Sequence, residues 1–390
     1  MIGVLGSRWT KLWTVGRASD EPERMADGPT LHWYLPTHGD TATIADNQAA
    51  DGSRVPSYLE PSLDNLTVLA RAAEDLGFEA ALTPTGSYCE DSWLATAALA
   101  QHTRALKFLV AFRPGVLSPT LAAQQVSTYQ RFTGNRLALN VVTGGDDAEM
   151  RRFGDDVDKS ARYRRTGEFL AIVRGVLSHD EFSFDGEFYS VERAKTAYPV
   201  TTRPTVYFGG SSPEAIAVAA EHADVYLTWG ETPEQVAEKF ERVRAAAAEH
   251  GRTLRFGVRL HTVARPTTAQ AWERAEELLA DLSPEQVAQA HARYTASVSE
   301  GQRRMAALTD GVLRDARSLE IAPGLWAGPS LVRDGAGTAA VGSYADVAGV
   351  LGRYVDVGAS EFILSGYPQI DEIRHVGAGV APLLRIGAAA

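Results

Sequence analysis

The chain has 390 residues, of which 45% are hydrophobic and 22% are charged, so its composition is that of a globular protein with a large core. Its formal net charge of −11 makes nucleic acid a poor partner, because phosphate backbones bind to basic faces, and no apolar run reaches the length of a membrane helix. The single cysteine, Cys89, excludes a disulfide framework and a thiolate metal cluster, and we expect a cytoplasmic protein.

Residues 1–30 form the first distinct segment. They include the basic residues Arg8 and Lys11, but no continuous apolar stretch follows, so the segment does not resemble a signal peptide. We expect a poorly ordered extension, or a start of translation further downstream, and one domain over residues 31–390.

From residue 31 onward, apolar segments of strand length alternate with segments of helical period. Several of them, such as the run FLVAF, are apolar at every position, which is typical of strands buried on both faces of a parallel sheet. The strands that we expect cover residues 31–36, 80–84, 107–112, 136–142, 205–209, 225–229, 255–263 and 361–364.

The helical segments carry start and stop signals, such as a capping serine at Ser62 and a terminating glycine at Gly77. The expected helices cover residues 62–77, 119–134, 160–178, 213–223, 233–251, 343–358 and 370–384. Eight strands separated by helices favour a closed (β/α)8 barrel, the TIM barrel of the α/β class. An open, doubly wound sheet stays possible, because the periodicity of a sequence does not show whether a sheet closes.

Two insertions interrupt the regular spacing. Residues 179–204, with a turn at Asp185-Gly186, predict a β-hairpin before the fifth strand. Residues 265–342 form a long excursion between the seventh and eighth strands, with helical stretches at 269–282 and 284–309 and a glycine-rich segment at 335–342. A long insertion at the carboxyl end of barrel strands is a typical position for an active-site lid.

The fifth strand runs into Gly209-Gly210-Ser211-Ser212-Pro213, where the next helix begins. Glycines allow close approach of the backbone to a ligand, and the free N–H groups of a helix N-terminus favour an anion. The segment is therefore either a phosphate site or a plain capped turn, and the motif alone does not decide between them.

Arg259 and His261 lie two residues apart on the seventh strand, so their side chains share one face. If that face lines the barrel, an inward arginine needs an anionic partner, because an unpaired charge is costly there. The partner is either a ligand, which we favour, or a nearby carboxylate of the protein.

Two further residues are ambiguous. Arg304 belongs to a charged pair on an expected helix, which from the residues alone is typical of a solvated surface. Cys89 is most simply a small buried residue, and its acidic neighbours Glu90 and Asp91 would raise its thiol pKa, which argues against a nucleophile. Cys89, His38 and His261 have no metal-ligand spacing, so we expect no metal.

Taken in order, the strand-end motifs LPTHGD, PTGSYCED, NVVTG, YFGGSS and YLTWGE resemble the bacterial-luciferase-like flavin monooxygenases, and among them most closely the alkanesulfonate monooxygenases. The resemblance covers about residues 31–384. It implies a two-component enzyme that takes reduced FMN (FMNH2) from a separate NAD(P)H:FMN reductase and uses O2 as co-substrate. The implied reaction converts a small organosulfonate to an aldehyde and sulfite, and relatives imply a homo-oligomer.

The resemblance also assigns residues by motif. Those that match active-site positions of the family are Arg259, His261, Arg304, Tyr367 and Cys89, with Arg304 on the lid. Those that match cofactor-binding positions are Thr143, Lys159, Tyr163, Ser211, Ser212 and His38.

Three departures from the family pattern bear on the substrate. Gln369 stands where the family commonly has a histidine, and Lys159 also replaces a histidine. The segment of residues 41–53 differs as well, since the family usually has an acidic residue near Asn47. They motivate an alternative in which the same flavin chemistry acts on a sulfone or another small molecule. A flavin-binding paralogue without activity and a deazaflavin-dependent oxidoreductase are the other hypotheses.

Overall fold

The structure is a computed structural model that describes residues 28–45 and 58–387. The expected extension over residues 1–30 lies outside the described residues as far as residue 27, and so do residues 46–53 of the divergent segment. No helix in the described ranges is long and apolar enough to cross a membrane.

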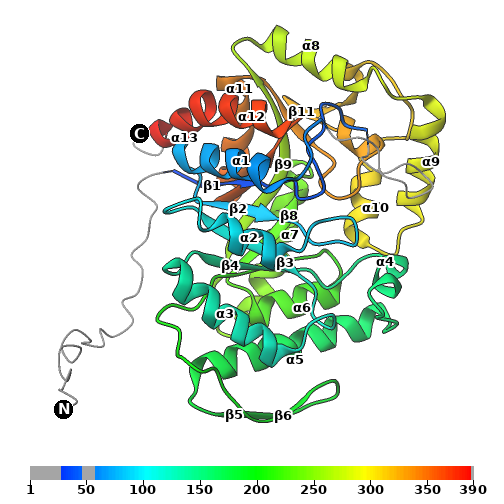
Figure 1. The fold of residues 1–390 in the computed structure, drawn as a ribbon. Helices are drawn as coiled ribbons and strands as arrows, with labels where there is room; N and C mark the ends of the chain where they lie inside the picture. The colour runs from blue at the N-terminus through cyan, green and yellow to red at the C-terminus, as the bar shows by residue number, and fades with distance from the viewer. Residues whose placement is uncertain (1–27, 46–57, 388–390) are drawn as a thin grey trace, which may run out of the picture.

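Parallel strands form a closed barrel that helices surround (Figure 1). The barrel strands are β1 (Thr30–Tyr34), β2 (Ala80–Thr83), β3 (Lys107–Phe112), β4 (Leu137–Val141), β7 (Val206–Gly209), β8 (Val225–Trp229), β9 (Arg255–Arg265) and β13 (Glu361–Ser365). They follow the order β9-β13-β1-β2-β3-β4-β7-β8, and pairing of β8 with β9 closes the ring. The prediction of a (β/α)8 barrel is therefore confirmed, and the open sheet is excluded.

The surrounding helices begin at side-chain caps, since Ser62, Ser118 and Ser212 each accept a backbone N–H of the first turn. The helices are α1 (Leu63–Asp75), α2 (Ser92–Leu99), α3 (Pro119–Thr133), α4 (Asp147–Arg152), α5 (Lys159–Ser178), α6 (Pro213–His222), α7 (Pro233–Glu249), α11 (Tyr344–Asp356), α12 (Gln369–His375) and α13 (Ala381–Gly387). The last expected helix is interrupted, because a π-helical turn over Val376–Val380 joins α12 to α13.

Side chains fill the middle of the barrel. Tyr34, Leu82, Leu109 and Ile363 belong to one buried apolar cluster inside it, which makes the barrel a packed core and not a channel. Polar groups that could act on a ligand are therefore confined to the ends of the strands.

The first insertion forms the predicted hairpin, with β5 (Phe182–Asp185) and β6 (Ser190–Ala194) paired antiparallel below α5 in Figure 1. The second insertion, residues 265–342, is called the lid segment below. It contains α8 (Thr268–Leu279), α9 (Pro284–Thr295), α10 (Glu300–Ala306), β10 (Glu320–Ala322), β11 (Leu325–Trp326) and the start of β12 (Ala339–Ser343).

The structure adds two details to the pattern expected for the lid segment. The helical stretch expected over residues 284–309 consists of two helices, because α9 ends at Thr295 and Ser299 caps a new helix, α10. The glycine-rich segment ends in strand β12, which pairs parallel with β9 over His261–Arg265, past the point where β8 ends. The lid segment is thus tied to the barrel sheet at both of its ends.

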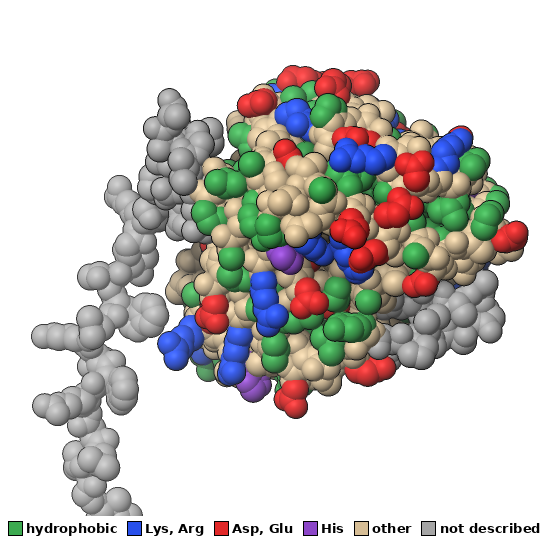
Figure 2. Space-filling model, turned by 90° about the horizontal axis from the view of Figure 1, so that it is seen from above, with side chains coloured by type: hydrophobic (Ala, Val, Ile, Leu, Met, Phe, Trp, Pro, Cys, Tyr) green, Lys and Arg blue, Asp and Glu red, His purple; other side chains and the backbone are tan. Residues whose placement is uncertain are grey.

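Acidic, basic and apolar side chains are interspersed on the face of the molecule seen in Figure 2. Among the described residues visible there, basic side chains do not form a continuous band. This face therefore lacks the electrostatic pattern that binding to a phosphate backbone requires.

Candidate active site

The mouth of the barrel contains an arginine, Arg259, for which the described residues provide no counter-ion. The guanidinium of Arg259 lies 4.5 Å from the centre of the Tyr34 ring, which is a cation–π contact. Its Nε is buried and has no hydrogen-bond partner, and no carboxylate of the described residues forms an ion pair with it. The carboxylate partner that the sequence left open is therefore not found in the described part of the chain.

His261 lies beside Arg259 in a fixed tautomer. Its Nε2 is 3.0 Å from the carbonyl oxygen of Ala336, and its Nδ1 is 2.8 Å from the hydroxyl of Ser365. Because a carbonyl can only accept, Nε2 carries the proton, and Ser365 donates to Nδ1. Burial, together with the charges of Arg259 and Arg333, lowers the pKa of His261 well below its usual value, so the ring is neutral.

Tyr367 completes this group, with its hydroxyl 3.2 Å from Nε2 of His261 and its ring 4.9 Å from the imidazole, centre to centre. Tyr34, whose ring contacts Arg259, also contacts His38, since its hydroxyl lies 3.4 Å from Nδ1 of that histidine. Cys89 is half-buried nearby, and burial raises its pKa to about 12. Cys89 is therefore a neutral thiol, as the sequence predicted. The main cause of its raised pKa is burial, and the charges of acidic residues contribute less.

Most of the predicted phosphate-binding residues meet at the start of α6. Ser212 caps this helix, because its hydroxyl accepts the backbone N–H of Ala215 at 3.3 Å, and its side chain lies near Tyr163. Gly210 has a φ of +144°, and a Cβ there would lie 2.5 Å from that of Ala215, so only glycine fits. Ser211 lies beside Ser212 and is also buried. The arrangement leaves several donors at a helix N-terminus, which suits an anion.

Lys159 lies one turn before Tyr163 on α5, so both are on one face of that helix. Its ammonium donates to the carbonyl of Val298 in the lid segment at 2.6 Å, and burial lowers its pKa. Thr143 contacts the same helix further along, 3.4 Å from the hydroxyl of Thr166. The structure therefore groups Lys159, Tyr163 and the two serines, with Thr143 at the edge toward the barrel.

Arg304 is not on a solvated surface. Its Nε donates to a carboxylate oxygen of Glu231 at 2.8 Å, and its second nitrogen also contacts that carboxylate. The carboxylate of Glu231 is almost completely buried and forms a second ion pair, with Lys239 of α7. The surface interpretation of Arg304 is therefore wrong, whereas its neighbour Arg303 is exposed.

Two residues at the mouth were missed as site residues. The guanidinium of Arg333 lies 5.5 Å from the centre of the Tyr367 ring and donates to the carbonyl of Ala45 at 3.2 Å. Trp229 ends β8 opposite Arg259, and a Cβ on Gly301 of α10 would lie 3.2 Å from its ring. Trp229 stood within a strand-end motif, whereas Arg333 lies in an irregular segment where no pattern indicates which way a side chain points.

The departure at Gln369 has a local structural role. Its backbone N–H donates to Asp40 at 2.9 Å, and its side-chain oxygen accepts from the N–H of Gly366 at 3.2 Å. These bonds hold the start of α12 against the loop after β1. Burial raises the pKa of Asp40 to about 6.

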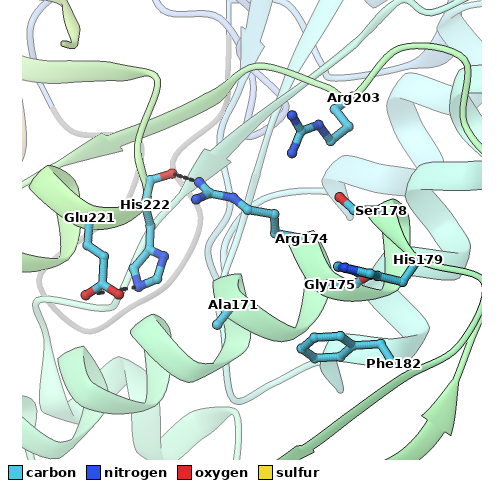
Figure 3. Close-up of a pocket in the computed structure, with 9 residues that line it drawn as sticks. All are labelled: Ala171, Arg174, Gly175, Ser178, His179, Phe182, Arg203, Glu221 and His222. Carbon is cyan, nitrogen blue, oxygen red and sulfur yellow. Dashed lines mark hydrogen bonds and ion pairs between the residues drawn. The ribbon is translucent and has the colours of Figure 1, made fainter. Parts of the chain in front are cut away.

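A cavity of about 370 Å³ lies elsewhere, between α5 and α6 (Figure 3). Arg174 lines it and donates to the carbonyl of His222, the last residue of α6, at 2.8 Å. Because α6 runs from the carboxyl end of β7 to the beginning of β8, this cavity lies at the opposite end of the barrel from Arg259. It is not part of the site at the mouth.

Comparison with known proteins shows the family and the fold of the chain. The model of the luciferase-like monooxygenase family matches residues 30–361. Among solved structures, the chain is similar to a riboflavin lyase determined with modified FMN and riboflavin, at 18% identity over 93% of both chains and a TM-score of 0.74. It is also similar to a long-chain alkane monooxygenase, at 17% identity over 92% of both chains and a TM-score of 0.72. An EDTA monooxygenase from Chelativorans sp. BNC1 is 16% identical over 93% of this chain and 95% of that one, with a TM-score of 0.71.

Proposed function

Since the chain belongs to the luciferase-like monooxygenase family, we propose that it is a two-component monooxygenase that uses FMNH2 and O2 to convert an alkanesulfonate to an aldehyde and sulfite. The observation that carries the proposal is the guanidinium of Arg259, which has no carboxylate partner among the described residues, beside the neutral imidazole of His261 at the barrel mouth. A cation without a counter-ion is suited to an anionic ligand, and both reduced FMN and a sulfonate are anionic.

The residues at the start of α6 fit the phosphate of FMN. The hydroxyls of Ser211, Ser212 and Tyr163 and the ammonium of Lys159 would donate to it, while Gly210 lets the backbone approach. Thr143 and His38 would lie toward the ring system. FMN, when bound in its reduced form, supplies the electrons that activate O2 for insertion next to the sulfonate.

The side chains at the barrel mouth would each have a separate role in the reaction. Arg259 orients the anionic reactants and stabilises negative charge that develops on an oxygen. His261 stays neutral and keeps its proton at Nε2, so it serves as a hydrogen-bond donor and not as an imidazolium. The hydroxyl of Tyr367, within reach of Nε2, is the group best placed to deliver a proton. Helix α10, packed on Trp229, would exclude water.

A neutral sulfone is the second candidate substrate, and a specific observation favours it. Arg304 already has a carboxylate partner in Glu231, so a ligand without charge would leave that ion pair intact. A sulfonate, in contrast, would have to compete for Arg304 or rely on Arg259 alone.

The proposal is tested by measuring sulfite release from short-, medium- and long-chain alkanesulfonates. The assay contains FMN, NADPH, O2 and a generic flavin reductase. We expect sulfite above a control that lacks the chain, and loss of that signal in the His261→Ala variant. Tight binding of reduced FMN without sulfite would contradict the sulfonate assignment. Preference for a deazaflavin over FMN in a binding titration would contradict the cofactor.

The proposal includes two partners. A separate NAD(P)H:FMN reductase would supply FMNH2, and we expect both proteins in the cytoplasm, where NAD(P)H is available. We also expect a homo-oligomer, which sedimentation velocity of the purified chain would show directly.

A further inference from the structure

One buried carboxylate at the barrel mouth holds two cations from different parts of the chain. Glu231 follows β8 and has a side-chain exposure of 2%, and it pairs both with Lys239 of α7 and with Arg304 of the lid segment. Lys239 is 3% exposed and also donates to the hydroxyl of Thr228 at 2.8 Å. Arg304 is different, because its side chain is 30% exposed.

Arg304 lies on the face of α10 that points toward the mouth. Gly301, three residues earlier on the same helix, packs on the ring of Trp229, and residues three apart share a helix face. Trp229 is the register partner of Arg259. The Glu231–Arg304 pair is therefore at the edge of the proposed ligand site, where α10 meets the barrel.

We propose that Glu231 and Lys239 are positioning residues for Arg304: Glu231 holds Arg304 and keeps α10 closed, and Lys239 lets Arg304 leave Glu231 for the anionic group of a substrate. The substrate part of this inference rests on the proposed function, whereas the closure of α10 does not.

The physical reason is the cost of a buried charge. If Glu231 had Arg304 as its only partner, departure of Arg304 would leave a carboxylate buried without a counter-ion, which is strongly unfavourable. With Lys239 permanently in place, Glu231 remains paired when Arg304 leaves. Arg304 can therefore exchange one anion for another at moderate cost, and such an exchange couples the lid to substrate charge.

Two variants should shift the lid in opposite directions. Glu231→Gln removes the partner of Arg304 and should speed amide hydrogen exchange in residues 299–306 by about tenfold. Lys239→Met makes Arg304 the sole counter-ion of Glu231 and should slow the same exchange by a similar factor. Both measurements use the full chain without flavin or substrate, so they do not depend on the proposed function.

Controls separate this effect from general loosening of the fold. Glu249→Gln makes the same chemical change on an exposed residue of α7 and should leave the exchange in residues 299–306 unchanged. The double variant Glu231→Gln/Lys239→Met leaves no buried charge unpaired and should match Glu231→Gln. Faster exchange in Lys239→Met, or unchanged exchange in Glu231→Gln, would overturn the proposal.

The specificity part needs a ligand. With octanesulfonate as the probe, Glu231→Gln should lower KM because Arg304 is released, and Lys239→Met should raise KM, with smaller effects on kcat. Opposite exchange effects with equal KM values in both variants would overturn the coupling to substrate charge. If no variant releases sulfite while the exchange effects hold, the sulfonate assignment fails and the closure of α10 by Glu231 stands.

Discussion

Replacing Arg259 by methionine tests the central feature of the site. Methionine is similar in length and apolar, so the change removes the charge and keeps most of the volume. Among the described residues, the guanidinium is compensated by the Tyr34 ring, 4.5 Å away, and such a contact contributes about 1–2 kcal/mol when partly desolvated. Removal of a half-buried charge that no described carboxylate pairs offsets that loss, so we expect the free energy of unfolding to change by less than about 1 kcal/mol.

Ligand binding should respond much more strongly. A hydrogen bond between a charged donor and an anion contributes about 1.5–3 kcal/mol, which corresponds to a roughly 10- to 150-fold loss of affinity. Reduced FMN carries negative charge on its ring system at neutral pH and oxidised FMN does not. The loss in Arg259→Met should therefore be large for reduced FMN and small for oxidised FMN.

The assay is anaerobic titration of the chain with reduced FMN, repeated with oxidised FMN in air. Arg131→Met is the matched control, because Arg131 also stacks on a tyrosine, 3.8 Å from the centre of the Tyr198 ring, but on the exposed side of α3. Equal losses for both forms of FMN, or a destabilised free protein, would refute the reasoning and make Arg259 a structural residue.

Three further predictions concern the phosphate site and the histidine. Gly210→Ala should abolish tight FMN binding, since its Cβ would lie 2.5 Å from that of Ala215 at a φ of +144°; binding as tight as in the parent chain would contradict the geometry. Ser212→Ala should lower FMN affinity, and it should also lower the free energy of unfolding by about 1 kcal/mol because the helix cap is lost. Ser211→Ala should lower FMN affinity alone. Titration with FMN measures the affinity, and calorimetry measures the stability of each variant. Because the pKa of His261 is lowered in the folded chain, only the unfolded chain binds a proton at this residue as the pH falls through about 6.5. The free energy of unfolding should therefore be highest above about pH 6.5 and should decrease as the pH falls further. The ring signals of His261 in NMR should stay constant through that pH, and a titration there would show a protonated ring.

The barrel was predictable because its strands are buried on both faces. Such strands are apolar throughout, and amphipathic helices with clear caps separate them, so local pattern and architecture agree. Helix α2 had no such signal, since its sequence SWLATAAL is apolar or small nearly all around and has little helical period. The lid segment was also harder to predict, because several short helices show the same helical period of apolar residues as one long helix.

At the site, motifs indicated the residues but not their partners. The pair Arg259 and His261 was predictable from alternation along a strand. The bond between Arg304 and Glu231 was not, since the two residues are 73 positions apart and each alone is typical of a solvated surface. Contacts between residues so far apart in the chain decide whether a charged side chain is buried, and they cannot be inferred from a single sequence.

The pairing of β12 with β9 has a consequence for how this protein could diversify. Arg265, where the lid segment begins, and Ser343, directly after its end, are neighbours in register on adjacent strands. The chain thus leaves the barrel and returns at almost the same point, so replacing the intervening residues with a longer or shorter piece changes the entropy of closure only slightly. A segment anchored in this way could change in length while the pairing of the barrel strands stays as it is.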